Sequence, residues 1–407
     1  MCAVSEFLTD EDRKAIRAPI SEARTFPQIA YRSQEFFELE VEHLFAQNWV
    51  AVGFAGSLPR VGDVAPLDIF GIPLLIMRGD AGAIRVFHNI GAHDGCPVVL
   101  TRQSPVATIE GPYHGWQYNL RGELIKAPFW DGTPNPDLSR LRSQSADLKE
   151  IRSAIWQDII FVDLSGKCPT LPVFLTPLMA LFEDFDFSTL EMAHDSADGD
   201  GIHRFHAKAN WKPLWENYAP NVYHEGFVHQ QYRRSKHVPR VDKQAQKTFR
   251  EVNDGIVKGL SFEAAGVSNT YPDVDFPRIK SKATGAPVTW SYILNIYPNA
   301  TFLVFPTHVR ISILVPEDVG NTQWLIASYY ADGSARDPRY KEMREKSING
   351  SSRARVEDDR VCEAVQRARR SPAHRSHFYS PFWEKMHYDF NNMVLNDLER
   401  SGTGLWS

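Results

Sequence analysis

Two pairs of histidines in this sequence could bind a transition metal, because imidazole is a common metal ligand. His93 and His114 stand in the short patterns G-x-H and G-x2-H, and His224 and His229 are five positions apart in an aromatic-rich segment. Residues 357–359 add a run of three acids. Imidazole and carboxylate groups are common ligands of divalent iron and its neighbours. Taken singly, each feature is more often an ordinary histidine, or an acid near a helix start, than a metal ligand.

The elements that must position these residues follow from the spacing of apolar residues. Residues 33–49 predict an amphipathic helix that Ser33 can cap. From residue 49 to 163, short apolar runs are broken by Gly, Pro and Asp, which is typical of a small all-β domain. We expect a helix over 175–187, and then antiparallel strands of one sheet over 249–332.

Charged helices are expected from the last of these strands to the C-terminus. The predicted fold class is therefore α+β, with a sheet whose helices pack on one face, similar to a helix-grip arrangement. The predicted domains are an all-β domain at 45–163 and a larger domain formed by 1–44 and 164–407.

Length, charge and cysteine content narrow the class of protein. A chain of 407 residues with 43% hydrophobic residues is long for one domain and natural for two. The formal net charge of -5 comes from well-mixed charges, so neither a nucleic-acid surface nor a polybasic membrane patch is expected. The acidic first residues do not resemble a signal peptide, and four scattered cysteines read as reduced thiols. We therefore expect a cytoplasmic protein.

The all-β region resembles a Rieske domain in two segments, Asn89–Gly95 and Gly111–Trp116. Rieske domains hold a [2Fe-2S] cluster through C-x-H and C-x2-H, with two thiolates on one iron and two imidazoles on the other. Here Gly91 and Gly111 stand where the resemblance calls for cysteine. The expectation is therefore that no [2Fe-2S] cluster is present. Cys96 could instead join the two histidines in a zinc site, although a buried thiol is the more ordinary interpretation.

A second match covers residues 210–217 and 221–229. It is similar to the motif of the large (α) subunit of Rieske-type non-haem iron ring-hydroxylating oxygenases, in which two histidines hold a mononuclear iron. The resemblance assigns these roles to His224 and His229. On a regular helix, residues five apart diverge by about 140°, so the helix must be distorted, and Pro220 offers a local cause.

The resemblance also implies a carboxylate ligand on a C-terminal helix, and residues 357–366 match its E-D…Q pattern. Asp358 is the first choice, because it lies in register with Val361, Cys362 and Val365 on a stripe that would face a core. Asp359 is the second choice. The implied cofactor is a mononuclear Fe(II).

Asn221 departs from the family pattern, which has an aspartate three residues before the first histidine. In the family that aspartate links the iron ligand to a cluster histidine of the neighbouring subunit. Asparagine keeps the size and the hydrogen bonding but loses the negative charge. We therefore treat Asn221 as a catalytic position that has changed.

Two functions are consistent with these residues. The first is an iron oxygenase that acts on a small aromatic or apolar substrate with dioxygen and takes electrons from the substrate or from a partner, such as a ferredoxin, a reductase or a complete α subunit. The second is a non-catalytic accessory subunit that assembles with a complete α subunit. A homomeric or mixed trimer or hexamer is expected. Aromatic residues that would suit such a substrate are Trp215, Tyr218, Phe227, Trp290 and Tyr292.

Overall fold

The computed structural model describes residues 4–218, 223–229, 249–263 and 276–400. The chain forms two compact units, one made of Met1–Val50 with Pro169–Ser407 and the other of Ala51–Cys168. The N-terminal segment therefore belongs with the second half of the chain. Within the described residues, no helix has both the length and the apolar character that a membrane span requires.

The smaller unit is built from short strands. Six of them form one sheet in the order β1-β9-β8-β4-β3-β2, and three more form a separate small sheet in the order β5-β6-β7. The six are β1 (Val50–Phe54), β2 (Val64–Ile69), β3 (Ile72–Arg78), β4 (Ile84–His88), β8 (Glu150–Trp156) and β9 (Ile159–Asp163). The three are β5 (Ile109–Glu110), β6 (Gln117–Tyr118) and β7 (Leu124–Lys126), and one short helix, α3 (Ser139–Ser143), follows them.

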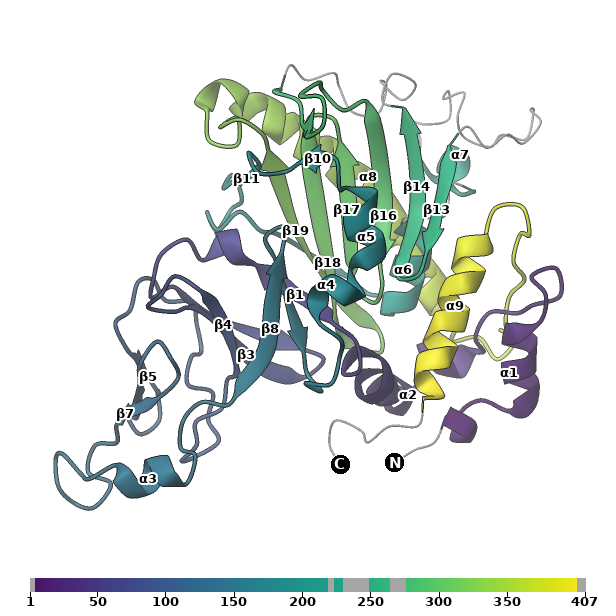
Figure 1. The fold of residues 1–407 in the computed structure, drawn as a ribbon. Coiled ribbons are helices and arrows are strands. Elements are labelled where there is room, and N and C mark those ends of the chain that lie inside the picture. Colours follow the sequence, from purple (N-terminus) through teal and green to yellow (C-terminus); the bar gives the residue numbers. More distant parts are fainter. Residues whose placement is uncertain (1–3, 219–222, 230–248, 264–275, 401–407) are drawn as a thin grey trace. The chain divides into compact units, whose positions relative to one another are not determined.

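The larger unit contains an eight-stranded sheet in the order β11-β19-β18-β17-β16-β14-β13, with β12 also paired to β19 (Figure 1). All of its pairings are antiparallel. The strands are β11 (Glu191–Met192), β12 (His203–Ala207), β13 (Arg250–Asp254), β14 (Val257–Glu263), β16 (Trp290–Ile296), β17 (Ala300–Phe305), β18 (His308–Asp318) and β19 (Asn321–Tyr330). A two-stranded pair joins β10 (Phe185–Asp186) to β15 (Lys280–Ser281).

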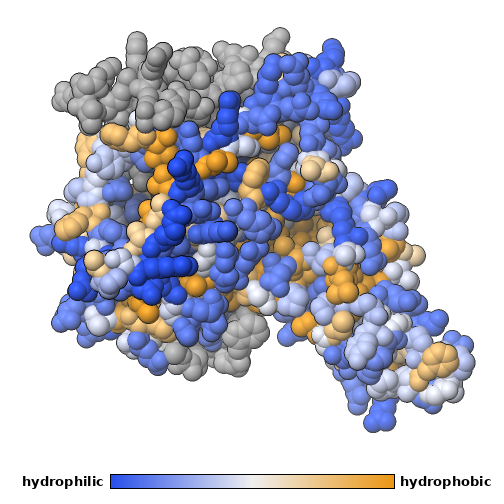
Figure 2. Space-filling model, turned by 180° about the vertical axis from the view of Figure 1, so that it is seen from behind, coloured by the Kyte–Doolittle hydropathy of each residue, from blue (hydrophilic) through white to orange (hydrophobic). Residues whose placement is uncertain are grey.

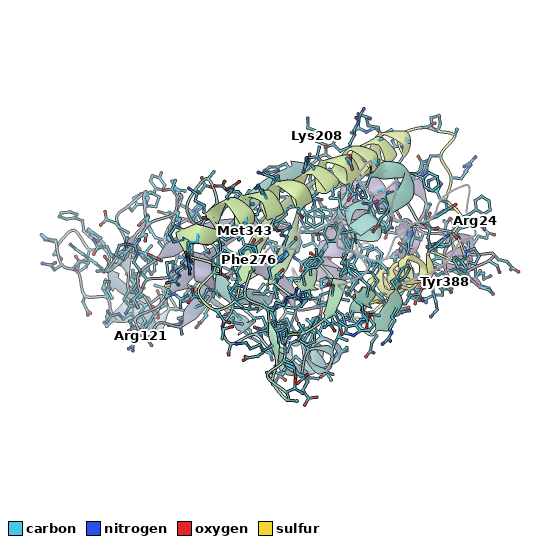
Figure 3. The ribbon with its side chains drawn as sticks, turned by 90° about the horizontal axis from the view of Figure 1, so that it is seen from above. Arg24, Arg121, Lys208, Phe276, Met343 and Tyr388 are labelled. Atoms are coloured by element: carbon cyan, nitrogen blue, oxygen red, sulfur yellow. The ribbon has the colours of Figure 1, made fainter. Side chains whose placement is uncertain are left out.

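The long helix α8 (Lys341–Ala368) lies along one side of this sheet (Figure 3). Further helices of the unit are α1 (Asp10–Arg17), α2 (Gln34–Glu40), α6 (Trp211–Tyr218), α7 (Glu225–Val228) and α9 (Lys385–Leu398). The predicted fold class is confirmed: a small all-β domain accompanies a larger domain of antiparallel sheet and helices. The face seen in Figure 2 is mainly hydrophilic with scattered apolar residues, as is usual for a protein surface.

Two predicted helices are shorter than the periodicity indicated. Ser33 caps α2 as expected, because its hydroxyl accepts a hydrogen bond from the Phe36 amide, but α2 ends at Glu40 and a π-helical turn follows over Val41–Phe45. The helix expected over 175–187 forms only as α5 (Thr176–Leu181), and a separate short helix, α4 (Leu171–Phe174), precedes it. Each of these helices has a proline in its first turn, where the missing amide costs nothing.

Helix α6 is fixed to the N-terminal segment by a fully buried ion pair. Lys212 Nζ lies 2.5 Å from Glu40 Oε1, and the Trp211 indole donates to Glu40 Oε2 at 2.9 Å. Burial raises the pKa of Glu40 and lowers that of Lys212, and the attraction between the two groups opposes both shifts. Mutual neutralisation is what permits both groups in a dry core, because a buried charge without a partner is strongly destabilising.

Candidate metal centre and its cavity

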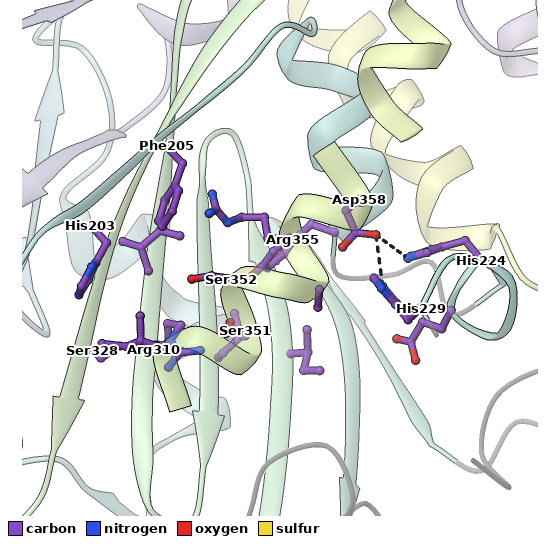
Figure 4. A pocket seen from close by; sticks show the side chains of 17 residues that line it. His203, Phe205, His224, His229, Arg310, Ser328, Ser351, Ser352, Arg355 and Asp358 are labelled. Atoms are coloured by element: carbon purple, nitrogen blue, oxygen red, sulfur yellow. Dashed lines mark hydrogen bonds and ion pairs between the residues drawn. The ribbon is translucent and has the colours of Figure 1, made fainter. Parts of the chain in front are cut away.

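Three of the predicted ligands converge in the larger unit. The Nε2 atoms of His224 and His229 each lie 3.2 Å from Asp358 Oδ1, and one ligand atom from each residue falls within 4.8 Å of the others (Figure 4). Asp358 comes from α8, whereas the histidines flank α7. The structure therefore brings together side chains about 130 positions apart in the chain.

The backbone at α7 explains how two histidines five positions apart can meet. His224 is the N-cap of this four-residue helix, and His229 is its C-cap with extended geometry (φ −88°, ψ 108°). The chain thus leaves the helix at His229, and the two ring centroids lie 5.4 Å apart. The expectation of one distorted helix carrying both histidines is wrong, because a single helical turn separates them. Pro220 lies outside the described residues.

Glu357 supports the group from outside, and the sequence reasoning missed it. Its Oε2 atom lies 2.8 Å from His229 Nδ1, so this nitrogen can donate its proton to the carboxylate, while Nε2 faces Asp358 on the other side of the ring. Carboxylate partners of this kind fix the tautomer and the orientation of metal-binding histidines. The only signal in the sequence was that Glu357 directly precedes Asp358.

The carboxylate of Asp358 and the imidazole of His229 shift each other's pKa values. Burial acts to raise the pKa of Asp358, but hydrogen bonds from His224 and His229 outweigh it and lower the pKa to about 2. Burial acts to lower the pKa of His229, but its bonds to Asp358 and Glu357 raise the pKa to about 9. A largely buried carboxylate facing two imidazoles has a strong affinity for positive charge, which a proton or a metal ion can supply.

The donor set fits mononuclear iron. Two imidazole nitrogens and one carboxylate oxygen on one side of an ion form the facial arrangement that non-haem Fe(II) oxygenases use, with open positions left for other ligands. The second-choice ligand, Asp359, is not part of the group. Its Oδ2 atom lies 3.9 Å from Arg355 Nη1, and burial raises its pKa to about 7.

The buried stripe of α8 differs from the predicted one. Val361 is 39% exposed, whereas Arg355, Cys362 and Gln366 are buried. The side of α8 that faces the sheet is therefore rotated slightly from the stripe inferred from apolar residues, and it includes a buried arginine and a buried glutamine. Asp358 lies at the edge of this stripe and is partly exposed.

A cavity of about 90 Å³ lies beside the three ligands. Its lining comes from the end of α6, from α7 and the histidines that flank it, from residues 348–358 of α8, and from strands β12, β16, β17, β18 and β19 (Figure 4). Its lining is mixed: the apolar residues are Phe205, Tyr218, Ile293, Leu303, Ile326, Ile348 and Ala354, and the polar ones include His203, Arg310, Ser328, Ser351, Ser352 and Arg355. The space suits a small molecule with polar groups.

Most of the aromatic residues that the sequence offered for substrate lie elsewhere. Only Tyr218 lines the cavity. Trp215 is buried and stacked on Phe390, and Tyr292 packs edge-on against Phe182. The Arg250 guanidinium stacks over the Trp290 ring. Asn221 lies outside the described residues. Aromatic residues of the sheet therefore serve the core more than the cavity.

The two histidine loops of the smaller unit repeat one backbone pattern. The Gly91 amide donates to Cys96 O and the Gly111 amide to Trp116 O, both at 2.8 Å, and each loop closes with a second bond to the same glycine. His114 Nδ1 lies 2.7 Å from Asp94 Oδ2, and His93, Asp94 and His114 can bring one ligand atom each within 4.8 Å. Cys96 is not a member of this group.

Comparisons with known proteins match both units. Residues 194–399 match the family model of the ring hydroxylating alpha subunit (catalytic domain), and residues 48–137 match that of the Rieske [2Fe-2S] domain. Choline monooxygenase of Arabidopsis thaliana is 24% identical over 97% of this chain and 87% of its own length. The oxygenase subunit of glycine betaine monooxygenase from Pseudomonas aeruginosa is 28% identical over 47% of this chain and 42% of its own length.

Solved structures show the same fold. A quaternary ammonium Rieske monooxygenase, described in connection with carnitine oxidation and inter-subunit electron transfer, superimposes with a TM-score of 0.74, 20% identity, and coverage of 94% of this chain and 98% of that one. Naphthalene 1,2-dioxygenase with bound indole gives a TM-score of 0.71, 16% identity and 95% coverage of both chains.

The match of residues 48–137 corrects one expectation. The prediction that the chain has no [2Fe-2S] cluster is wrong, because this region matches the Rieske [2Fe-2S] domain. Within the two loops, His93 and His114 fit the imidazole half of such a ligand set, whereas Gly91 and Gly111 have no side chain to contribute to the thiolate half.

Proposed function

The chain belongs to the family of ring-hydroxylating oxygenase α subunits and is an oxidoreductase, and from this premise we propose that it is a non-haem iron oxygenase that modifies a small polar molecule. His224, His229 and Asp358 would hold the iron. Iron held there would supply the activation of dioxygen. In the overall reaction one oxygen atom would enter the substrate and the other would leave as water, with two electrons and two protons from a donor.

The observation that carries this proposal is the placement of the three ligand atoms at the wall of the cavity. Asp358 Oδ1 lies 3.2 Å from both imidazole nitrogens, and all three residues also line the cavity of about 90 Å³. A substrate in this space would therefore lie beside the ion. Glu357 holds the His229 ring in the orientation that binding requires.

The choice of substrate is guided by the lining and by the relatives. Choline, glycine betaine and carnitine appear in the names of the similar proteins, and all are small and polar. The expectation of an aromatic or apolar substrate has little support in a cavity lined by two arginines and three serines. We therefore propose a small polar substrate, with aromatic hydrocarbons ranked below it.

The electron supply is part of the proposal. We place Gly91 and Gly111 at the two cysteine positions of the Rieske motif, which the spacing of His93 and His114 supports. A side chain would be tolerated at 111, since a Cβ there would meet nothing closer than Trp116 O at 3.6 Å. A cluster in this domain would then need two ligands from outside these positions. We propose that electrons come from a partner protein, which is a reductase, a ferredoxin or a complete α subunit. The chain would assemble as a trimer or hexamer.

The decisive experiment measures oxygen use with iron and a donor system. Protein loaded anaerobically with Fe(II) should consume dioxygen in proportion to product, and Asp358→Ala should abolish this activity. His206→Ala is the matched control, because that histidine is largely exposed and lies outside the ligand group. Activity that persists without Asp358 in a mixed complex with a complete α subunit would instead identify an accessory subunit.

A further inference from the structure

Two buried arginines share the cavity with the metal ligands. Arg310 on β18 is 2% exposed and Arg355 on α8 is 5% exposed, and both residues are among those that line the cavity (Figure 4). Burying a guanidinium is costly unless a partner neutralises it or satisfies its donors. The contacts of these two side chains therefore indicate what the cavity is built to receive.

The described residues leave several of their donors unused. Arg310 Nε donates to Ser328 Oγ at 3.1 Å and Nη2 to Ser347 Oγ at 3.2 Å, but Nη1 has no hydrogen-bond partner. Neither Nη atom of Arg355 has one, and the nearest carboxylate in an ion pair with it is Asp359 at 3.9 Å. Buried polar groups in proteins are nearly always satisfied, so unused donors at a cavity wall point to a ligand.

The charge of the lining leads to the same conclusion. Among the described lining residues, Arg310 and Arg355 are cationic and Glu225 and Asp358 are acidic. A divalent ion held by Asp358 would leave an excess of positive charge around the space. Burial, with the added field of Arg310, lowers the pKa of His203 on the same wall, which disfavours a positive charge on this ring.

The same features argue against a substrate that is only a cation. Recognition of quaternary ammonium groups relies on exposed aromatic faces. Phe205 and Tyr218 are the aromatic residues of the described lining, and the Arg355 guanidinium already lies 3.3 Å from the centre of the Phe205 ring. A second cation in this position would meet a like charge.

We infer that the substrate is a small organic anion whose carboxylate binds to Arg355 and Arg310. Arg355 is three residues before Asp358 on α8, so their Cβ atoms are about 5–6 Å apart on one side of the helix. A carboxylate held by Arg355 would thus place the rest of the molecule beside the metal ligands. Guanidinium groups suit carboxylates because they offer two parallel donors. That the bound anion is oxidised rests on the proposed function, whereas its binding to the two arginines does not.

Four compounds of nearly equal shape test it. Choline and glycine betaine carry a trimethylammonium group with an alcohol or a carboxylate, and 3,3-dimethylbutan-1-ol and 3,3-dimethylbutanoate are their uncharged-head counterparts. Calorimetric titration of anaerobic, iron-loaded protein should show that both carboxylates bind at least about tenfold more tightly than the matching alcohols, about 1.4 kcal/mol. Choline binding more tightly than 3,3-dimethylbutanoate, or no binding of either carboxylate at millimolar concentration, would overturn the inference.

Variants assign the binding to the arginines. Arg355→Met and Arg310→Met should each weaken carboxylate binding at least about tenfold, while Arg355→Lys should retain part of it. Arg353→Met is the matched control, because Arg353 lies on the same helix but is exposed. Circular dichroism and thermal unfolding identify any variant that fails to fold. Unchanged affinity in both folded methionine variants would contradict the inference.

Asp358→Ala separates this inference from the proposed iron chemistry. Carboxylate binding should persist in that variant if the arginines hold the anion, even though oxygen use is lost. Binding that disappears in Asp358→Ala but survives in Arg355→Met would show instead that the carboxylate binds the ion. Failure of the iron chemistry, with arginine-dependent binding intact, would leave the anion site standing alone.

Discussion

The Nδ1 atom of His229 lies 2.8 Å from the Oε2 atom of Glu357, one residue before the carboxylate that faces the other side of the same ring. Consecutive residues of α8 therefore hold both nitrogens of one imidazole. This arrangement determines which nitrogen carries the proton and leaves Nε2 available for an ion.

We predict that Glu357→Gln weakens metal binding about 10- to 100-fold without removing any ligand. The amide can still accept the Nδ1 proton but no longer raises the basicity of the ring. Competition titration against a chromogenic chelator measures the change. Equal affinity of the variant and the wild type would show that the contact does not act on the metal.

His224→Ala should remove most of the bound iron, because an ion with two remaining protein ligands loses its facial set. Iron content after anaerobic loading and desalting is the measurement. His206→Ala on β12 is the control and should keep its iron, since its side chain is 60% exposed. Iron content that is the same in both variants would refute the assignment of His224.

Lys212→Met should destabilise the larger unit by about 3–5 kcal/mol, because it leaves Glu40 buried without its cation. The double variant Glu40→Gln/Lys212→Met should recover much of this loss, since the Trp211 indole can still donate to the new amide. Denaturant unfolding of the wild type, Lys212→Met, Glu40→Gln and the double variant gives the coupling energy. An additive double variant would mean that the pair does not interact.

A second buried pair predicts a dependence of stability on pH. His387 Nε2 lies 3.3 Å from Glu216 Oε1. Burial opposes both charges, but the pair outweighs it and lowers the pKa of Glu216 from 4.5 to about 2 and raises that of His387 from 6.5 to about 9. The stabilisation from His387 is complete below pH 6.5 and is lost as pH rises through about 9. That from Glu216 is complete above pH 4.5 and is lost as pH falls through about 2.

The two contributions are therefore both complete between about pH 4.5 and 6.5. The melting temperature of His387→Gln should fall furthest below that of the wild type in this window, and the difference should shrink towards pH 9. Thermal unfolding of both proteins across this range tests the prediction. A difference that is constant with pH would show that His387 contributes packing alone.

Much of the fold could be predicted from the sequence because it depends on local pattern. Alternating and continuous apolar runs over 249–332 predicted the antiparallel strands, and Ser33 marked the start of a helix at the correct residue. The loops around His93 and His114 were recognisable from short motifs with fixed spacing. Helix lengths were less predictable, because the π-helical turn after Glu40 and the break between α4 and α5 have only weak local signals.

The sequence by itself determined the types and the order of the groups that meet at the candidate site. These are the two imidazoles of His224 and His229 and the carboxylate of Asp358. Only the tertiary structure decided how they meet. The extended backbone at His229 turns its ring back towards Asp358, and β18 packed against α8 brings Arg310 into the cavity that Arg355 also lines. The physical reason is that periodicity reports which side of one element is buried, whereas the direction of a charged side chain depends on neighbours that are distant in the chain.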